Sequence, residues 1–375
     1  MSLYKEFIMN TSFRRMTLQC CYDHSPIYKW FKLSCKSDVM LNQFKIFITL
    51  AMGLITGFNL IAQQVQLLSP GPATSIRGLS VVDDRVIWVS GSNGKVGRSL
   101  DSGNTFQWIT VHGFEKTDFR DIEAFSETAA VIMGIAAPAY LLKTSDGGST
   151  WKVVFENKDT AMFLDAMEFW NEHSGIVIGD PVQGKFFVAR TFNGGISWKD
   201  IPTANYPVAD SGEACFASSG TNIRALNQQE AVFVSGGLKS NLFIRDKKYP
   251  IPIIQGTSST GANSIAVKNK ELMMVVGGDF NNSTDTTRNC YITFDGGQQW
   301  QSPVTPPNGY RSCVEYLDKK RWITCGLNGI DISTDDGLHW TSISSEGFHV
   351  CRKAKKGKAV FFAGGGGRIA KLVSQ

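Results

Sequence analysis

The chain has 375 residues, with 38 Lys/Arg against 33 Asp/Glu and a formal net charge of +5. Most of this excess lies in residues 1–62, because 31 of the basic and 30 of the acidic residues come after them. The remainder is close to neutral and has no long run of Lys or Arg, which excludes a nucleic-acid-binding track.

The first 62 residues are predicted to lie outside the mature protein. Residues 1–39 contain Cys20, Cys21 and Cys35 but no copy of the repeat described below. We interpret them as an upstream extension, with a short disordered cytoplasmic tail as the alternative. Residues 40–62 have the features of a secretory signal peptide: one Lys, an apolar run over 46–61, and a cleavage point at Ala62-Gln63.

That apolar run is too short and too rich in glycine for a membrane span. The sequence therefore predicts a mature domain over residues 63–375. We expect it to be periplasmic or secreted, to have no stable membrane span after signal removal, and to be a monomer.

A short motif then recurs five times. Its pattern is Ser/Thr, any residue, Asp or Asn, any residue, Gly, two more residues and an aromatic. We refer to these five segments as the turn motifs. Their side chains fit a tight hairpin, because Asp or Asn accepts backbone hydrogen bonds, Gly takes a positive φ and the aromatic packs back over the turn. The turn motifs are residues 99–106, 144–151, 191–198, 293–300 and 333–340.

We assign these motifs to structure and not to chemistry. The residues in these structural positions are Asp101, Asp146, Trp151, Asn193, Trp198, Asp295, Trp300, Asp335 and Trp340.

The spacing of the turn motifs predicts a propeller. The Asp or Asn positions are separated by 40 to 47 residues, apart from one gap of 102 that leaves room for a degenerate unit. Glycine-bearing loops at Gly236 and Gly364 resemble those before the motifs and add two units, the first with residues 247–250 in place of the turn. A period of this length is typical of propeller blades.

The fold class predicted from these units is an all-β, seven-bladed β-propeller with four-stranded antiparallel blades. The last unit lacks its final strand at the C-terminus. Residues 64–68 are the candidate that supplies it, so that N- and C-terminal strands close the ring and remove the free edges.

A candidate binding site comes from the first residues of the seven innermost strands, which we place at 76, 119, 163, 212, 262, 310 and 348. Their early positions are polar in nearly every unit, and ring closure would bring them to one mouth of the central channel. The alternative is a hydrated channel in which these charges pair with one another. The candidate ligand-binding residues are Arg77, Arg120, Asp121, Asp165, Glu213, Asn263, Arg311 and His349.

The sequence offers no metal or cofactor motif, so the predicted cofactor and metal sets are both empty. The four histidines after residue 62 are scattered, and there is no P-loop and no nucleophile elbow. The cysteines of the predicted domain are interpreted as free buried thiols; the alternative is one or two disulfides, for which Cys313 and Cys325 are the candidate pair. The cysteines of this domain are Cys215, Cys290, Cys313, Cys325 and Cys351.

The turn motifs match the Asp-box, or BNR repeat. Together with the segments F-R-D-I-E-A-F from 119, F-L-D-A-M-E-F from 163, G-Y-R-S-C-V-E-Y from 309 and G-G-G-R-I-A-K from 365, they resemble photosystem II stability/assembly factor-like propellers of non-photosynthetic bacteria. That group is similar in fold to sortilin and to BNR propellers, and more loosely to WD40 and YVTN repeats. The glutamine at the predicted cleavage point resembles secreted proteins of Bacteroidetes.

The resemblance covers roughly residues 64–375. It implies an extracytoplasmic binding or assembly module, chaperone-like, whose partner is a protein, a peptide or an anionic small ligand. An Arg-rich patch is implicated in the photosynthetic branch. Here Arg77, Arg120 and Arg311 match it by blade position alone.

Two other function classes remain open, so enzymatic activity is left undecided. Sialidases also carry Asp-boxes, and Glu213, Asp121 and Asp165 could supply the carboxylates of a glycoside hydrolase. Sialidases, however, have six blades and a starting motif that residues 75–78 match only in part. A redox-associated protein, a label that many such sequences carry, would need a cofactor site that the sequence does not show.

Overall fold

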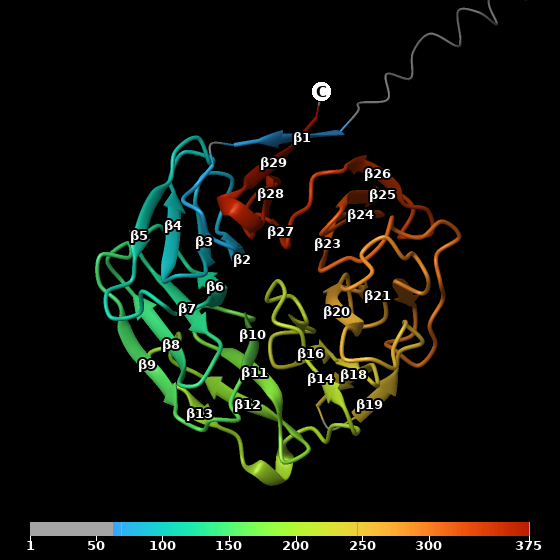
Figure 1. The fold of residues 1–375 in the computed structure, drawn as a ribbon, viewed down its shortest axis with the longest axis horizontal. Helices are drawn as coiled ribbons and strands as arrows, with labels where there is room; N and C mark the ends of the chain where they lie inside the picture. Colours follow the sequence, from blue (N-terminus) through green and yellow to red (C-terminus); the bar gives the residue numbers. More distant parts are fainter. Residues whose placement is uncertain (1–62, 69, 246, 375) are drawn as a thin grey trace, which may run out of the picture. The chain divides into compact units, whose positions relative to one another are not determined.

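The computed structural model is a ring of seven antiparallel β-sheets, numbered here as blades one to seven (Figure 1). It describes residues 63–68, 70–245 and 247–374, so the predictions for residues 1–39 and 40–62 lie outside the described residues. Helical structure among the described residues is limited to two short 3-10 turns, η1 (Thr203–Asn205) and η2 (Gly365–Gly367). The predicted all-β, seven-bladed fold is confirmed.

Blades one to three follow the predicted units, each running from an inner to an outer strand. Blade one contains β2 (Ile76–Val81), β3 (Ile87–Gly91), β4 (Lys95–Ser99) and β5 (Gln107–Thr110). Blade two contains β6 (Phe119–Ala124), β7 (Ala130–Gly134), β8 (Ala139–Thr144) and β9 (Lys152–Asn157). Blade three contains β10 (Leu164–Phe169), β11 (Gly175–Val182), β12 (Lys185–Thr191) and β13 (Lys199–Asp200).

Blades four and five depart from the predicted layout. Blade four contains β15 (Ile223–Ala225), β16 (Ala231–Val234), β18 (Asn241–Ile244) and β19 (Lys247–Pro250). Blade five is built on β20 (Thr260–Val267), β21 (Met273–Asp279) and β22 (Cys290–Thr293), with an isolated bridge between Ile292 and Gln301 at its outer edge. The short strands β14 (Glu213–Ala214) and β17 (Gly236–Gly237) join this sheet through β20.

Two details of the predicted fourth unit are therefore wrong. The innermost strand of blade four begins at Ile223 and not at 212, because β14 joins the sheet of blade five and residues 215–221 lie in the central channel, as described below. Residues 247–250 are the outermost strand of blade four and not its turn.

The ring closes as predicted. Blade six contains β23 (Cys313–Asp318), β24 (Arg321–Gly326), β25 (Gly329–Ser333) and β26 (Thr341–Ser344). Blade seven contains β27 (Val350–Lys353), β28 (Val360–Ala363) and β29 (Ile369–Ser374), and its outermost strand is β1 (Gln63–Leu67) from the other end of the domain. Five residue pairs join β1 to β29, from Gln63–Ser374 to Leu67–Ala370.

All five turn motifs make the same hydrogen bonds. In the second motif the Thr144 hydroxyl donates to Asp146 at 2.8 Å and accepts from the Gly148 amide at 3.0 Å. The Asp146 carboxylate then accepts from the amide of Thr150, four residues on, at 2.9 Å. Gly148 has φ +88°, the left-handed region that glycine tolerates. These bonds hold the turn with its own side chains, which fits the structural role assigned to the turn motifs.

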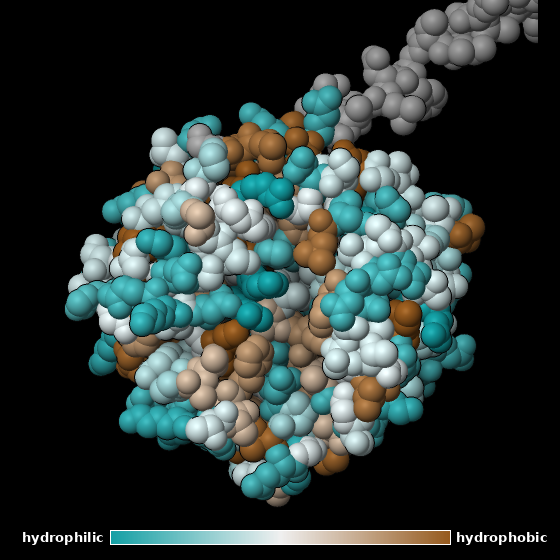
Figure 2. Space-filling model, viewed as in Figure 1, coloured by the Kyte–Doolittle hydropathy of each residue, from teal (hydrophilic) through white to brown (hydrophobic). Residues whose placement is uncertain are grey.

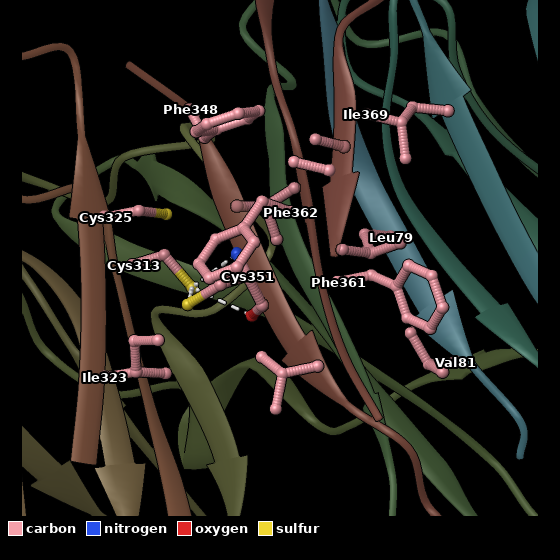
Figure 3. Packing of buried hydrophobic residues seen from close by; sticks show 14 of the residues in the cluster. Leu79, Val81, Cys313, Ile323, Cys325, Phe348, Cys351, Phe361, Phe362 and Ile369 are labelled. Carbon is pink, nitrogen blue, oxygen red and sulfur yellow. Dashed lines mark hydrogen bonds between the residues drawn. The ribbon is translucent and has the colours of Figure 1, made fainter. Parts of the chain in front are cut away.

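The core consists of apolar layers between neighbouring sheets. The largest layer joins blades six, seven and one, and Figure 3 shows part of it, with Phe348 and Phe362 beside Cys313 and Cys351. All five cysteines of the domain are buried and free in this structure. The disulfide between Cys313 and Cys325 is therefore not formed, although the two residues face each other across β23 and β24.

Candidate functional site

A chain segment extends into the middle of the ring and lies in the central channel. Residues 215–221, between β14 and β15, contact the inner strands of most blades, and Figure 1 shows this loop in yellow-green reaching toward the centre. The Ser219 hydroxyl donates to the carbonyl of Ser312 on blade six at 2.7 Å. Arg352 on blade seven donates to the carbonyl of Gly220 at 3.2 Å. We call this segment the plug.

Gly220 is needed where the plug meets blade two. Its φ is +62°, and a Cβ there would lie 2.4 Å from the Asp121 carboxylate. A larger side chain would therefore collide with an inward-facing acid, in a conformation that L residues rarely adopt.

One mouth of the channel holds a pocket of about 490 Å³ above the plug, a volume in the range of small-molecule sites. Its walls combine aromatic rings with a few polar groups from at least five blades. Its residues are Arg77, Arg120, Phe163, Asp180, Ala214, Cys215, Phe216, Ala217, Ser218, Asn263, Phe280, Tyr310, Ser312, Leu327 and His349. The face seen in Figure 2 is hollowed at the middle of the ring, where hydrophilic and hydrophobic side chains meet.

The cations of this channel-mouth pocket come from the neighbouring blades one and two. Arg77 donates to the plug carbonyl of Ser218 at 3.3 Å, and burial together with the charge of Arg120 lowers the pKa of Arg77. Arg120 pairs with Asp118 at 2.8 Å, stacks over the Phe163 ring at 5.8 Å and keeps 27% of its side chain exposed. Both guanidiniums retain N–H groups that can bind an anion.

The other walls of the pocket supply hydrogen-bonding groups that are already oriented. The Asn263 side-chain oxygen accepts from the Tyr310 hydroxyl at 2.8 Å and from Ser218 at 3.1 Å. His349 lies 3.3 Å from the Ser75 hydroxyl, and burial with the charges of Arg77, Arg368 and Arg120 lowers its pKa to about 3. The imidazole is therefore neutral at physiological pH, in surroundings that favour a negative ligand.

β-Bulges accompany three of these pocket residues, Arg77, Arg120 and Asn263. The pairing of innermost and second strands skips one residue near the start of blades one, two, three and five. A bulge re-aims the side chain of the extra residue. The skipped residues are Arg77, Arg120, Asp165 and Asn263, so Asp165 and not Leu164 is the blade-three counterpart of the arginines.

Four of the predicted residues line this pocket and four do not. Arg77, Arg120, Asn263 and His349 are brought together there. Asp121 and Asp165 are buried at neighbouring positions, where burial raises the pKa of Asp121 to about 7 and that of Asp165 well above its usual range. Both carboxylate oxygens of Asp165 lack a hydrogen-bond partner among the described residues, which fits a neutral acid.

Glu213 and Arg311 have structural roles. Glu213 lies on β14 and accepts from Asn241 at 2.8 Å and from the Asp210 amide at 2.6 Å. Arg311 is 0% exposed and donates to Asp331 on blade six at 2.6 Å. Arg311 therefore follows the alternative interpretation from the sequence, in which these charges pair with one another. Its guanidinium is held inside its own blade by Asp331.

Most of the lining residues were not among the predicted site residues, and Asp180 and Phe216 are two of them. Asp180 lies near the end of β11, the second strand of blade three, and accepts from the Cys215 amide at 2.8 Å; burial raises its pKa to about 6. Phe216 belongs to the plug, and its ring lies 5.8 Å from that of Phe280. The plug sequence, C-F-A-S-S-G-T over 215–221, is rich in small residues, and that composition does not by itself predict a segment inside the channel.

The channel below the plug holds a second group of charges. Arg224 contacts Glu315 at 3.3 Å and Glu168 at 3.7 Å, and Arg352 lies 4.0 Å from Glu315. Burial raises the pKa of both glutamates, while the arginines oppose that change. These charges satisfy one another, as buried charges must, so we assign no ligand to them.

Asp121 gives this lower channel a testable pH dependence. Its folded pKa of about 7 lies above the ordinary aspartate value, so the folded protein binds a proton that the unfolded chain has lost. Stability from this group is therefore present in acid and falls as pH rises from about 4 to 7, by at most about 1.4 kcal/mol per pH unit. We expect Asp121→Asn to remove that part of the slope in urea denaturation curves taken across this range.

His349 provides the control of opposite sign, because a lowered folded pKa makes stability rise with pH between about 3 and 6.5. His349→Gln should remove that rise. An unchanged slope in Asp121→Asn would contradict the protonated state of Asp121.

Three buried thiols form the one metal-type cluster found among the described residues. The sulfur atoms of Cys313, Cys325 and Cys351 lie within 4.8 Å of one another, with 3.6 Å between Cys313 and Cys351 (Figure 3). Soft ions such as Cu(I) prefer such ligands. Burial raises the pKa of Cys325 and Cys351, which keeps these thiols protonated and opposes metal binding.

Comparison with known proteins supports the fold. No protein-family model and no curated protein matches the chain. Among solved structures, "YCF48 bound to D1 peptide" is similar with a TM-score of 0.60 at 15% identity, over 85% of this chain and 97% of that one. YCF48 from Cyanidioschyzon merolae gives 0.60 at 16%, over 82% and 98%. The Pan2 WD40 domain of Neurospora crassa gives 0.58 at 14%, over 84% and 96%.

Proposed function

We propose that this propeller is an extracytoplasmic binding or assembly module whose channel-mouth pocket takes a peptide segment carrying a carboxylate. The observation that carries the proposal is the pair Arg77 and Arg120 from adjacent blades, at a pocket that also holds neutral His349. Arginine binds a carboxylate through two parallel hydrogen bonds. The carboxylate is that of an acidic side chain or of a chain terminus.

The apolar walls support a peptide over a small inorganic anion. Phe163, Phe216, Phe280 and Leu327 surround the polar groups, and a hydrophobic side chain next to the carboxylate would bury surface against them. The solved propeller described as YCF48 bound to D1 peptide is consistent with such a role, although that similarity shows the fold alone. The extracytoplasmic location rests on the predicted signal peptide at 40–62. No helix among the described residues is long and apolar enough to cross a membrane.

The glycoside-hydrolase alternative finds less support in the pocket. A glycosidase needs two carboxyl groups facing the scissile bond. Asp180 is the one acid among the described lining residues, whereas Glu213, Asp121 and Asp165 lie outside that lining. The pocket therefore favours binding over glycoside hydrolysis. Hydrolysis of a fluorogenic sialoside by the purified domain is the direct test of the glycosidase alternative.

The proposal is tested by panning displayed peptides against the purified domain. We expect selected peptides to share an acidic residue or free C-terminus next to a hydrophobic residue. Removing the Arg120 guanidinium by Arg120→Met should weaken binding of a selected peptide by about 1.5–3 kcal/mol in fluorescence anisotropy. The melting temperature should stay within a few degrees, because Arg120 is partly exposed.

Arg321→Met is the matched control, since Arg321 makes an exposed ion pair with Asp318 on blade six and does not line the pocket. Selected peptides that lack any carboxylate, or that bind both variants equally, would rule out the proposed role. Converting the peptide carboxylate to an amide should reproduce the loss seen with Arg120→Met.

A further inference from the structure

A second cavity lies between blades three and four, away from the channel-mouth pocket. Its volume is about 670 Å³, and its walls are mostly aliphatic and aromatic. We call it the inter-blade cleft. Its apolar walls come from β11, β12 and the segment after β13 on one side and from β15, β16 and β18 on the other. They are Ile176, Ile178, Val188, Ile201, Ile223 and Phe243, with Phe233 stacked on Phe243 at 4.5 Å.

The turn motifs explain why a cavity occurs at this interface. At other interfaces the motif glycine of one blade rests on the preceding blade. A Cβ on Gly148 of blade two would lie 2.8 Å from Ile109 and 3.5 Å from Trp88 of blade one. The motif glycines of blades three, five and six lie against the preceding blade in the same way. The contacts are Gly195 with Val131, Gly297 with Leu242 and Gly337 with Met274. The motif therefore fills the gap between neighbouring sheets.

Blade four has no turn motif. Its outer strands β18 (Asn241–Ile244) and β19 (Lys247–Pro250) follow one another closely in the chain, and Arg245 after β18 has φ +55°. The strand register identifies what is left uncovered on blade three. Trp88 pairs with Arg98 across β3 and β4, and Ile176 pairs with Arg190 across β11 and β12. Ile176 is thus the counterpart of Trp88, and it faces the inter-blade cleft instead of a motif.

Arg190 lacks the contact that its counterparts make. Arg98 donates to the carbonyl of Glu127 on blade two at 2.7 Å. Lys143 of blade two donates to the carbonyl of Gly194, inside the motif of blade three, at 2.5 Å. The buried Nε of Arg190 has no hydrogen-bond partner among the described residues, and its guanidinium stacks on Trp170 at 5.8 Å.

The other cations at the rim are already paired. Arg245 forms an ion pair with Glu230, and Lys248 forms one with Asp210 at 2.6 Å. Among the described residues, Arg190 is therefore the cation of the inter-blade cleft that has no carboxylate partner. It lies at the edge of the apolar cavity. An uncompensated cation beside apolar walls is complementary to a ligand with an anionic head and a hydrocarbon body.

We propose that the inter-blade cleft binds a straight-chain carboxylate, with its hydrocarbon chain against Ile176, Ile201 and Phe243 and its carboxylate on Arg190. The volume lies within the range of about 300–1,000 Å³ that small-molecule sites occupy. The inference is independent of the proposed peptide site, because the two cavities share no lining residue.

The test is calorimetric titration of the intact protein with dodecanoate, below the concentration at which the ligand forms micelles. We expect one saturable site. Arg190→Met keeps the apolar stem but removes the charge, and it should weaken dodecanoate binding about tenfold or more. Binding of dodecanol, which has no charge, should be the same in both proteins.

Two further variants locate the ligand. Ala231→Trp places a large side chain inside the inter-blade cleft and should abolish binding of both ligands, with Ile201→Trp as a second variant from the opposite wall if the first does not fold. Arg120→Met, at the channel-mouth pocket, should leave dodecanoate binding unchanged. If Arg120→Met did not weaken peptide binding, the proposed peptide site would be rejected, but the dodecanoate result at the inter-blade cleft would still stand.

Three outcomes would overturn the proposal. They are no saturable dodecanoate binding, equal dodecanoate affinity in wild type and Arg190→Met, or binding that survives in a folded protein with the inter-blade cleft filled. Binding of an aromatic peptide at the cleft, with no binding of dodecanoate, would identify a different occupant and would also reject it.

Discussion

Replacing Arg311 with alanine is expected to destabilise the folded protein by about 3–5 kcal/mol, the usual effect of removing one partner from a buried ion pair. Arg311 is 0% exposed and Asp331 is 1% exposed, and the arginine Nε lies 2.6 Å from the carboxylate. The variant would leave Asp331 buried with one backbone donor, the Asn308 amide at 3.1 Å. Urea denaturation at neutral pH measures the loss.

Paired substitutions distinguish an ion pair from a simple loss of packing. Asp331→Ala should cost a similar amount, because it leaves the guanidinium uncompensated. Replacing both residues together, as Arg311→Met with Asp331→Leu, should cost much less than the sum, since no buried charge remains. Equal, additive losses would show that the charges are not coupled.

Arg321→Ala is the surface control. Arg321 and Asp318 form an ion pair in which both side chains are about two-fifths exposed, so solvent screens the interaction. Its loss should change stability by about 1 kcal/mol or less. If Arg311→Ala behaved like this control, Arg311 would be available to a ligand, as the sequence first suggested.

The fold could be predicted because its determinants are local and repeated. Each turn motif specifies a hairpin with its own side chains, as Thr144, Asp146 and Gly148 show, and five copies in register specify the blade period. The unit without a motif was placed less well. There, residues 247–250 form a strand and residues 212–222 leave the blade, because no local signal fixed either boundary.

The candidate site could be predicted in part, since polarity at the start of an inner strand is visible in sequence but side-chain direction is not. Arg77, Arg120, Asn263 and His349 meet in the channel-mouth pocket. Arg311 has the same residue type and strand position in the sequence alignment, yet it turns into its own blade toward Asp331. The difference depends on backbone register, which an alignment of short segments does not contain.

The plug and the inter-blade cleft could not be predicted, because both depend on contacts between residues far apart in the sequence. The plug comes from a segment between blades three and four but contacts blades six and seven through Ser219 and Gly220. Such contacts depend on ring closure and have no signature at the residues themselves. The inter-blade cleft is similar, because its cause is a motif absent from one blade and its walls belong partly to the blade before it.

Deleting residues 63–68 is expected to lower stability by about 2–4 kcal/mol and to promote aggregation. The deletion removes the five residue pairs between β1 and β29 and the contacts of Val65 and Leu68 with the core of blades six, seven and one. It also leaves β29 as an open edge that can pair with another chain. Thermal denaturation and light scattering measure the two effects.

A peptide with the sequence of residues 63–68, added in excess to the deleted protein, should restore part of the melting temperature, because it can occupy the same edge in the same register. Gln66→Ala is the control for the side chains, since Gln66 is exposed and its backbone stays paired with Lys371. It should leave both readouts unchanged. A deleted protein that melts and scatters like the wild type would show that β1 contributes little to closing blade seven, despite its register with β29.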